Sequence, residues 1–398
     1  MDDLSRNFIK NLLLLILPLL ALLFSASCTN IKPAEWTIMI YMAADNNLSE
    51  QAVNDIIKME KAALPPTVNV IVQLDPNQYA SDPQARRYKI KQSDLSVISS
   101  PVIEYLGEID SGDYLTLTDF VNWSMEKYPA ERYALAIWSH GSGWTREESR
   151  WICPDNQSIN QMSIANGAFR NSFRLFKNQI DILILDACHM QNIEVISEVY
   201  PYADYVIGSE EATPFDGFPY YEILNDWGRF SSTESLAKRI ANNYIEAHKL
   251  GGSLNPNGVE RRVACSVAKS AEIEALLAHL TNFSNRWYPI ANSLEIRNAR
   301  ALCHPFNLQE SDVDIKELFQ NIYDTAANDN LRADASTILN SIERFFPAQM
   351  SVNLPNNIGT ATIWYPTYVE FFAGSKDLYT KLNFASTDWL RFLQHTFE

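Results

Sequence analysis

The chain has 398 residues, 46% of them hydrophobic and 20% charged, and this balance excludes a disordered polypeptide. Its formal net charge of -16 argues against a nucleic-acid partner, because a phosphate backbone attracts basic surfaces, and is compatible with cationic substrates. The length suits one large domain or two moderate ones.

Residues 1–27 have the features of an export signal. Arg6 and Lys10 precede the apolar run NLLLLILPLLALLF, and small residues follow in SASC. The run contains Pro18 and is shorter than the roughly 20 residues that cross a bilayer, which favours a cleaved signal over a membrane helix. Because Cys28 directly follows FSAS, as in a relaxed bacterial lipobox, we expect it to carry lipid and to anchor an exported lipoprotein on the periplasmic or cell-surface side. A plain secretory signal is the alternative.

After a linker at 28–35, apolar runs alternate with amphipathic segments, a pattern typical of a mostly parallel sheet covered by helices. We expect strands at 36–44, 68–75, 132–140, 181–187, 204–211 and 260–268. We expect helices at 48–62, 115–128, 192–200 and 233–249. The sequence therefore predicts an α/β core at 36–270. A mainly helical region at 271–398 follows, with a late strand near 360–367 that could return to the main sheet.

The cysteine pattern excludes two kinds of site. Five cysteines stand at positions 28, 153, 188, 265 and 303, and no CxxC spacing joins them, so neither a zinc site nor a disulfide framework is expected. We expect Cys153, Cys265 and Cys303 to be buried as small hydrophobic residues. Cys188 is the candidate for chemistry.

Cys188 follows a buried strand and precedes an amphipathic segment, so its sulfur is expected beside the N–H groups of a helix start, which favour a thiolate. His189 is not its base, because adjacent side chains diverge. His140 fits that role better, since the strands 132–140 and 181–187 are consecutive and should end at the same edge of the sheet. Either residue alone is more often a core cysteine or a loop histidine, but the pair favours catalysis.

The turn HGSGW after this strand contains Gly141 and Gly143, which allow the backbone to approach a ligand closely. The backbone N–H groups of Gly141 and Cys188 are the candidates for an oxyanion hole. The adjacent pair Cys303 and His304 cannot face each other in a helical context. The other histidines are expected to be surface or packing residues: His189, His248, His279 and His395.

Four motifs carry a resemblance to a known family: YMAADNNLSE, SHGSGW, LDACHMQNIEV and GSEEATPFDGFPY, in this order across 36–220. In these motifs the chain resembles the clostripain-like cysteine peptidases, which share a caspase-like fold with gingipains, legumains and caspases. The weaker segments DVDIKEL and TATIWYP extend the likeness towards the C-terminus. The resemblance implies hydrolysis of peptide bonds, often after Arg or Lys, with Cys188 as nucleophile and His140 as proton donor to the leaving amine.

Specificity for a basic side chain calls for an acid at the bottom of a pocket. Asp186, two residues before the nucleophile, is the first candidate, with a cap or turn role as its alternative. Asp216 is the second candidate, with an ordinary turn aspartate before Gly217 as its alternative. Asp45, Asn46 and Asn47 are expected to shape the loop behind the site and not to touch substrate.

The chain also departs from the family pattern, because His189 and Gln191 replace the usual leucine and glycine, which puts activity level and substrate preference in question. Several relatives are activated by cleavage between the histidine and cysteine motifs, where this chain has Arg146 and Arg150 as candidate self-cleavage sites. Calcium activates some relatives, but no EF-hand spacing occurs, so we expect no cofactor and no dedicated calcium loop.

Two other functions use the same residues. The first is a catalytically inactive lipoprotein that binds peptides on the same fold. The second is a thioesterase or acyltransferase, since nucleophilic chemistry alone does not identify the leaving group. The expected partners are a peptide or protein substrate and, through the lipid, a membrane. We expect a monomer.

Overall fold

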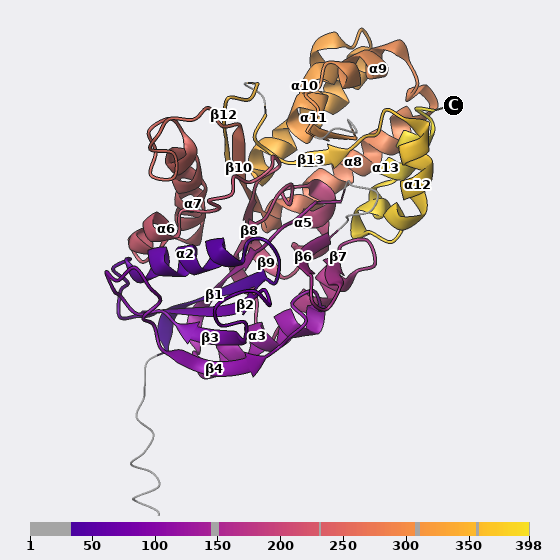
Figure 1. Ribbon diagram of the computed structural model, residues 1–398. Coiled ribbons are helices and arrows are strands. Elements are labelled where there is room, and N and C mark those ends of the chain that lie inside the picture. Colours follow the sequence, from indigo (N-terminus) through magenta and orange to yellow (C-terminus); the bar gives the residue numbers. More distant parts are fainter. Residues whose placement is uncertain (1–32, 145–150, 231, 307–310, 356–357, 398) are drawn as a thin grey trace, which may run out of the picture.

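The computed structural model describes residues 33–144, 151–230, 232–306, 311–355 and 358–397 (Figure 1). The expectations on residues 1–27, Cys28, Arg146 and Arg150 fall outside these ranges. In the part of the chain that the structure describes, no helix is long and apolar enough to cross a membrane.

A nine-stranded sheet forms the centre of the molecule, in the order β12-β10-β9-β8-β5-β1-β2-β3-β4. Its five middle strands run parallel to one another, which confirms the predicted mostly parallel α/β fold. The six strands expected from the sequence are all present: β1 (Ala34–Ala44), β2 (Val68–Pro76), β5 (Ala130–Trp138), β8 (Ile180–Asp186), β9 (Ala203–Gly208) and β10 (Val263–Lys269). Their near-continuous apolar runs reflect burial on both faces.

Helices cover both faces of the sheet (Figure 1). Alternate residues of β1 show the two sides, because Ile38 and Ile40 belong to one cluster of buried hydrophobic residues and Met39 and Tyr41 to the other. The first cluster includes residues of α2 (Ser49–Glu60), α6 (Tyr220–Asp226) and α7 (Thr233–His248). The second includes residues of α3 (Tyr114–Lys127), α4 (Ala168–Arg174) and α5 (Ile193–Val199).

The antiparallel strands at the margins of the sheet were not expected from the sequence. They are β3 (Ala85–Lys89), β4 (Val102–Gly107) and β12 (Ala348–Val352). In β3 the guanidinium group of Arg87 bonds Gln73 and pairs with Glu104, so a strand with buried charges gives no apolar signal. A hairpin of β6 (Trp151–Asp155) and β7 (Asn160–Ser163) was likewise missed.

The region after residue 270 is mainly helical. Its helices are α8 (Ile273–Trp287), α9 (Leu294–Ala301), α10 (Ile315–Thr325), α11 (Asp329–Phe345), α12 (Val369–Tyr379) and α13 (Trp389–Gln394). The late strand β13 (Thr362–Trp364) pairs with β11 (Asp312–Asp314) in a small antiparallel sheet, and not with the main sheet. The expectation that it could return to the main sheet is therefore wrong, because β12 already occupies the margin beside β10.

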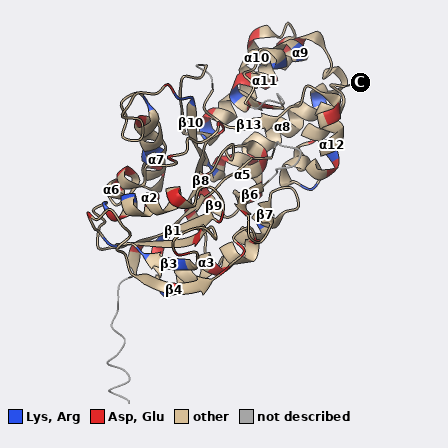
Figure 2. Cartoon of the chain, in the orientation of Figure 1, with Lys and Arg blue, Asp and Glu red and all other residues tan. Residues whose placement is uncertain are grey.

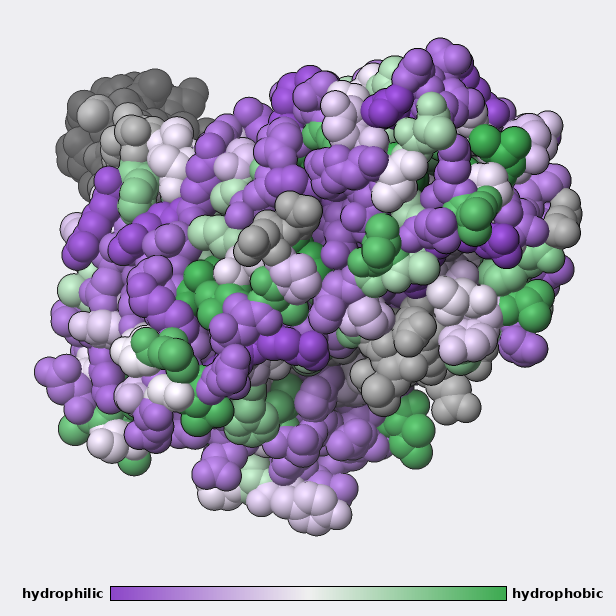
Figure 3. All heavy atoms as spheres, turned by 90° about the horizontal axis from the view of Figure 1, so that it is seen from above, coloured by the Kyte–Doolittle hydropathy of each residue, from purple (hydrophilic) through white to green (hydrophobic). Residues whose placement is uncertain are grey.

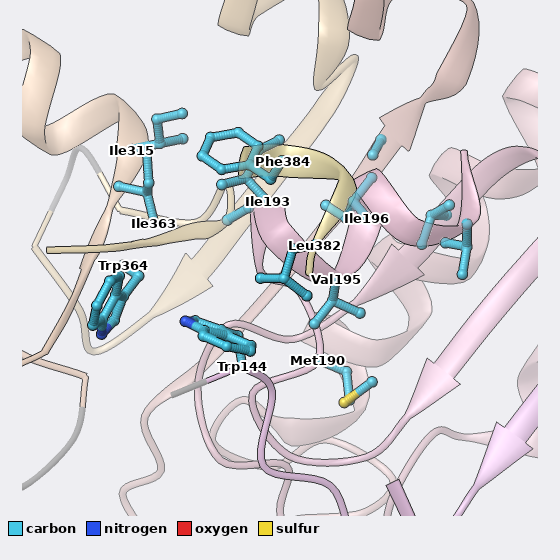
Figure 4. Packing of buried hydrophobic residues seen from close by; sticks show 14 of the residues in the cluster. Trp144, Met190, Ile193, Val195, Ile196, Ile315, Ile363, Trp364, Leu382 and Phe384 are labelled. Carbon is cyan, nitrogen blue, oxygen red and sulfur yellow. The ribbon is translucent and has the colours of Figure 1, made fainter. Parts of the chain in front are cut away.

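This region packs against the motif that contains His140. Trp144, at the end of that motif, is fully buried and lies 5.4 Å from Tyr379 and 6.3 Å from Trp364, as measured between ring centroids. Figure 4 shows Trp144 between Trp364 and the residues Met190 and Val195. Aromatic packing thus links the C-terminal region to the turns at the end of the sheet.

The surface carries interspersed charges of both signs (Figure 2). The face shown in Figure 3 is mostly hydrophilic, with scattered hydrophobic residues. Single exposed apolar side chains of this kind are ordinary on a folded domain and need no partner to explain them.

Candidate active site

The strands β5 and β8 bring His140 and Cys188 to the same edge of the sheet. They are parallel neighbours, and Trp138 pairs with Asp186 in their register. His140 lies two positions after Trp138 and Cys188 lies two positions after Asp186, so both residues follow the ends of their strands. Chemistry in α/β sheets commonly collects at the carboxyl ends of parallel strands, and this is such a place.

Both side chains line a cavity of about 250 Å³. Its walls come from the ends of β5 and β8, from the residue before α2, and from the loop after β9. The lining residues are Leu48, Trp138, Ser139, His140, Asp186, Ala187, Cys188, Thr213, Pro214, Phe215 and Gly217. A small cavity with a thiol, an imidazole and a carboxyl group among mainly apolar neighbours suits the recognition of one substrate side chain.

The imidazole of His140 is held by Asn47. Nε2 of His140 lies 2.7 Å from Oδ1 of Asn47, which accepts a hydrogen bond. The neutral ring therefore carries its proton on Nε2 and its lone pair on Nδ1. Burial lowers the pKa of His140, which favours this neutral form. His140 is thus prepared to accept a proton.

Cys188 is half-buried, whereas Cys153, Cys265 and Cys303 are buried. This confirms the expectation for the latter three, whose thiol pKa values are all raised by burial. The Sγ atom of Cys188 lies 3.8 Å from the carbonyl oxygen of Thr213. Among the described cysteines, Cys188 is the accessible thiol and the one that lines the cavity.

The expected helix start beside Cys188 is not present. Helix α5 begins at Ile193, and its first N–H groups are capped by Asn192, whose side chain accepts from the N–H of Val195. The chain from 187 to 192 forms an irregular turn instead, in which His189 has a φ of 59°. The helix N-terminus therefore does not account for a thiolate at Cys188.

Gly141 lies directly against the turn that carries Cys188. A Cβ atom at Gly141 would lie 2.8 Å from Cβ of Ala187 and 3.0 Å from the carbonyl oxygen of Cys188, so only glycine fits. The N–H of Gly141 has no acceptor among the residues that the structure describes. This donor is therefore available to a ligand beside Cys188.

Asp186 lies at the buried end of the cavity. It is 3% exposed, and its Oδ2 accepts hydrogen bonds from the N–H of Phe218 at 3.2 Å and the hydroxyl of Tyr220 at 3.0 Å. Burial, helped by the charge of Asp55, raises the pKa of Asp186 to about 7. A carboxyl group in this setting is easily ionised by a cation that enters the cavity.

Asp216 is placed differently. Its Oδ2 lies 3.1 Å from a guanidinium nitrogen of Arg261, and the residue does not line the cavity. Arg261 also donates to Nδ1 of His248 at 2.9 Å, and Nε2 of His248 donates to the carbonyl oxygen of Gly217 at 2.8 Å. Asp216, Arg261 and His248 thus form a polar network that supports the loop lining the cavity.

Three carboxylates could hold a metal ion near this site. Asp45, Glu108 and Asp155 each offer one oxygen atom, and these atoms lie within 4.8 Å of one another. They come from three separate segments of the chain, so no local spacing in the sequence points to them.

Comparison with known proteins identifies the family. The model of the clostripain family matches residues 40–353. The chain belongs to the clostripain family. Clostripain of Hathewaya histolytica is 29% identical over 223 residues, a match that covers 49% of this chain and 42% of clostripain. The match therefore spans less than half the length of that relative.

Solved structures share the fold of this clostripain-family chain. One is a secreted C11 cysteine protease from Bacteroides thetaiotaomicron in complex with an irreversible peptide inhibitor. Its TM-score is 0.66 and its sequence identity is 20%, and the match covers 86% of this chain and 99% of the other. Another is an inactive zymogen C11 protease from Parabacteroides distasonis, with a TM-score of 0.69 and 21% identity over 89% and 98% of the two chains.

The two departures from the clostripain-family pattern lie outside the cavity lining. Gln191 is fully buried, and its Nε2 donates to Oγ of Ser266 at 2.8 Å. Nδ1 of His189 lies 3.0 Å from the carbonyl oxygen of Glu210. These two side chains therefore connect the turn after β8 to β10 and to the segment after β9 by hydrogen bonds.

Two residues of this clostripain-family site have roles that sequence reasoning did not assign. Asn47 was expected only to shape a loop, yet it bonds His140. His248 was expected to be a surface or packing residue; it is 1% exposed, as a packing residue would be, and it also bonds the loop of Gly217, which was not expected. Both contacts join residues far apart in the chain, and no local pattern reveals them.

Proposed function

We propose that the protein is a cysteine endopeptidase that cleaves after Arg or Lys, with Cys188 as nucleophile and His140 as the proton-transfer residue. The observation that carries this proposal is the cavity that His140, Cys188 and the buried Asp186 line together. Membership of the clostripain family supports the same chemistry. The proposed chemistry uses only the thiol, the imidazole and backbone donors.

The first half of the reaction forms an acyl-enzyme. Nδ1 of His140 takes the Sγ proton of Cys188, and the thiolate attacks the carbonyl carbon of the peptide bond. The electron pair of the C=O bond moves to oxygen, where the N–H groups of Gly141 and Cys188 stabilise the negative charge. The C–N bond then breaks, the amine leaves with the proton from His140, and the acyl group remains on Sγ as a thioester.

The second half releases the acyl group. His140 takes a proton from water, and the resulting hydroxide attacks the thioester carbon. The C–S bond breaks, the peptide leaves as a carboxylic acid, and the thiolate of Cys188 takes back the proton from His140, which returns both residues to their starting forms. Asn47 keeps the ring of His140 in one orientation through both halves.

Selectivity for Arg or Lys before the scissile bond, the P1 residue, would come from Asp186. A guanidinium or ammonium group that reaches the buried end of the cavity would ionise this carboxyl group and form a charge-assisted hydrogen bond. Asp216 is the weaker candidate for this role, since Arg261 already neutralises it.

Cleavage of fluorogenic peptides with Arg, Lys, Leu or Asp at P1 tests the proposal, with Cys188→Ala as the control. We expect cleavage after Arg and Lys that is absent in the variant. Cleavage of thioesters but not amides would instead indicate the thioesterase. Binding of peptides without cleavage, with no labelling of Cys188 by a thiol reagent, would indicate the inactive binding lipoprotein.

We also propose export and lipid anchoring, on the basis of the signal-like residues 1–27 and Cys28. The mature protein would be a monomer held at a membrane by the lipid. Mass spectrometry of the N-terminal peptide tests this, because lipidation adds acyl mass to Cys28 and Cys28→Ser should abolish the addition. An unmodified N-terminus beyond residue 27 would indicate a plain secretory signal.

Self-cleavage at Arg146 or Arg150 is a further proposal. Both side chains are basic and lie in sequence between His140 and Cys188. One relative of the same fold is described as an inactive zymogen. Chain mass after incubation of the wild type beside Cys188→Ala tests this, with two fragments expected only in the wild type. An intact wild-type chain that cleaves peptides would contradict it.

A further inference from the structure

The turn that carries Cys188 lies against the chain that follows β9. We name residues 209–211 the supporting segment. The N–H groups of His189 and Gln191 donate to carbonyl oxygens of this segment at 3.3 and 3.0 Å. These bonds extend the parallel pairing of β8 with β9 beyond the ends of both strands. The position of Cys188 therefore depends on what holds the supporting segment in place.

Glu210 is the middle residue of the supporting segment, and its carboxyl group is buried without a donor. The residue is 1% exposed, and neither carboxyl oxygen accepts a hydrogen bond of normal geometry from a described residue. The polar group beside it is the carboxyl group of Asp314. Two carboxyl groups can form a hydrogen bond with each other only when one of them carries a proton. One member of this pair must therefore be protonated.

Asp314 is the member of the pair whose surroundings favour the ionised form. It is fully buried at the end of β11, and its Oδ1 accepts from the N–H of Glu317 at 2.8 Å. Its Oδ2 accepts from the N–H groups of Gly359 and Thr360 at 3.2 and 3.0 Å, and from the hydroxyl of Thr360 at 2.7 Å. Hydrogen bonds of this kind stabilise a carboxylate. Asp314 is therefore the acceptor, and Glu210 is the acid that keeps its proton.

The charges around the pair favour the same assignment. Burial raises the pKa of Glu210 well above its usual value of 4.5; the charges of Asp314 and Glu211 raise this pKa further, whereas the N–H of Gly359 opposes the rise. In the described part of the chain, no Lys or Arg forms an ion pair with Glu210 or Asp314, and the nearby Arg262 pairs with Glu211 at 3.7 Å. The other titratable groups around the pair are His189, His304 and Glu317. A buried carboxylate without a counter-charge is costly, so Glu210 needs its proton.

The small sheet of β11 and β13 contacts both the turn and the supporting segment at one position in its register. Asp314 of β11 pairs with Thr362 of β13. The N–H of Thr362 donates to the carbonyl oxygen of Gln191 at 3.1 Å, and its hydroxyl accepts from Nδ2 of Asn192 at 3.1 Å. Asp314, on the neighbouring strand, meets Glu210. The C-terminal region therefore contacts the turn of Cys188 directly and also through the supporting segment.

We propose that Glu210 is a positioning residue, whose carboxylic acid donates a hydrogen bond to Asp314 and so joins the turn of Cys188 to the C-terminal region. Glu210 does not line the cavity, so it acts through the backbone of the supporting segment. That segment leads directly into Thr213 and Pro214, which do line the cavity. The positioning role rests on the proposed function of Cys188, whereas the pairing of the two acids does not depend on it. Loss of the proton would place two negative charges side by side in a buried site and weaken the connection.

Thermal unfolding as a function of pH tests the acid pair without a substrate. Glu210→Gln replaces the O–H donor by an N–H donor that cannot titrate. In the wild type, the folded state keeps the proton above pH 4.5 while the unfolded chain loses it, so Glu210 should lower Tm as the pH rises from that value. The Tm of Glu210→Gln relative to the wild type should therefore rise by several degrees between about pH 5 and about pH 8.5. Glu370→Gln, which changes an exposed acid on α12, should show no such rise. A difference for Glu210→Gln that does not change with pH would overturn the acid pair.

Kinetics with an Arg peptide tests the positioning role. Glu210→Met has a side chain of the same length as Glu210→Gln but no donor, so its kcat should be about fivefold or more below that of Glu210→Gln, with KM little changed. Equal kcat values in the two variants would overturn the positioning role. A Glu210→Met protein that is unfolded at pH 5, beside a folded Glu210→Gln, would assign Glu210 to folding and overturn that role as well. If the wild type cleaves no peptide, the proposed peptidase and the positioning role both fail, whereas the unfolding test still decides on the acid pair.

Discussion

Oδ1 of Asn47 lies 2.7 Å from Nε2 of His140, so an amide that follows β1 orients an imidazole that follows β5. The contact fixes which ring nitrogen carries the proton and leaves Nδ1 free to act as a base. It gives His140 the orienting third group that nucleophilic sites commonly contain.

Replacing Asn47 by Ala should lower kcat about tenfold or more, with KM little changed, because a tenfold loss needs only about 1.4 kcal/mol of transition-state stabilisation. Steady-state kinetics with an Arg peptide measures this. Asn47→Asp keeps the acceptor, so it should retain more activity and raise the pKa of His140. Equal kcat in the wild type and Asn47→Ala would show that the contact has no catalytic role.

Asp186→Asn should reduce kcat/KM for Arg peptides by roughly 30-fold to 150-fold, which corresponds to about 2–3 kcal/mol for one lost charge-assisted hydrogen bond. Peptides with Leu at P1 should be affected far less. Asp216→Asn is the matched control, since its carboxylate pairs with Arg261 outside the cavity. If the control loses as much selectivity as Asp186→Asn, the assignment of the specificity residue is wrong.

The same carboxyl group predicts a pH dependence. Burial raises the pKa of Asp186 from 3.8 to about 7, and only the ionised form pairs with a cationic side chain. In the wild type, kcat/KM for Arg peptides should therefore rise with pH up to about 7 and then level off. In Asp186→Asn, kcat/KM for Arg peptides should no longer rise with pH below about 7. If the pH dependence is the same as in the wild type, Asp186 is not the group that causes it.

The carboxyl group of Asp186 keeps its proton to a higher pH in the folded state than in the unfolded chain. Asp186 should therefore also reduce the free energy of unfolding as the pH rises from about 4 to about 7.

His248→Gln should weaken binding of basic substrates by loosening the loop of Gly217. Burial lowers the pKa of His248 to about 4, so the ring is neutral above that pH and donates from Nε2 to Gly217. We expect a KM for Arg peptides raised about threefold to tenfold, as for one lost hydrogen bond, with kcat nearly unchanged. A parallel loss of kcat and thermal stability would instead indicate a general structural defect.

Trp144→Ala should lower the free energy of unfolding by about 3–5 kcal/mol, because it removes a fully buried ring that packs on Trp364 and Tyr379. Denaturant unfolding measures the loss. Tyr105→Ala is the control, since Tyr105 is 61% exposed and its loss should cost about 0.5 kcal/mol or less.

Much of this arrangement follows from local sequence patterns. Apolar runs revealed the central parallel strands, and their consecutive order placed His140 and Cys188 at one edge. The pattern failed where side chains are charged or the strand is half-exposed, as in β3 with its buried Arg87 and in β4 at the margin. The pattern also placed the helix start too close to Cys188. His189 has a left-handed backbone conformation and lies in a turn before α5, and the hydrophobic periodicity gives no sign of this turn.

The remaining features depend on contacts between distant segments. Asn47 and His140 are 93 residues apart, and Asp45, Glu108 and Asp155 come from three separate segments. Likewise, β12 pairs with β10 at the margin of the main sheet, and β13 pairs with β11 instead. Such contacts follow from the fold and cannot be derived from spacing along one segment.

The most direct test of the central claim is labelling with an irreversible thiol-reactive peptide that carries Arg at P1, followed by peptide mapping in a mass spectrometer. The account predicts one label per chain on Cys188, none on Cys153, Cys265 or Cys303, and much slower labelling in Asp186→Asn and His140→Ala. Labelling of another cysteine, or equal rates for peptides with Arg and Asp at P1, would contradict it.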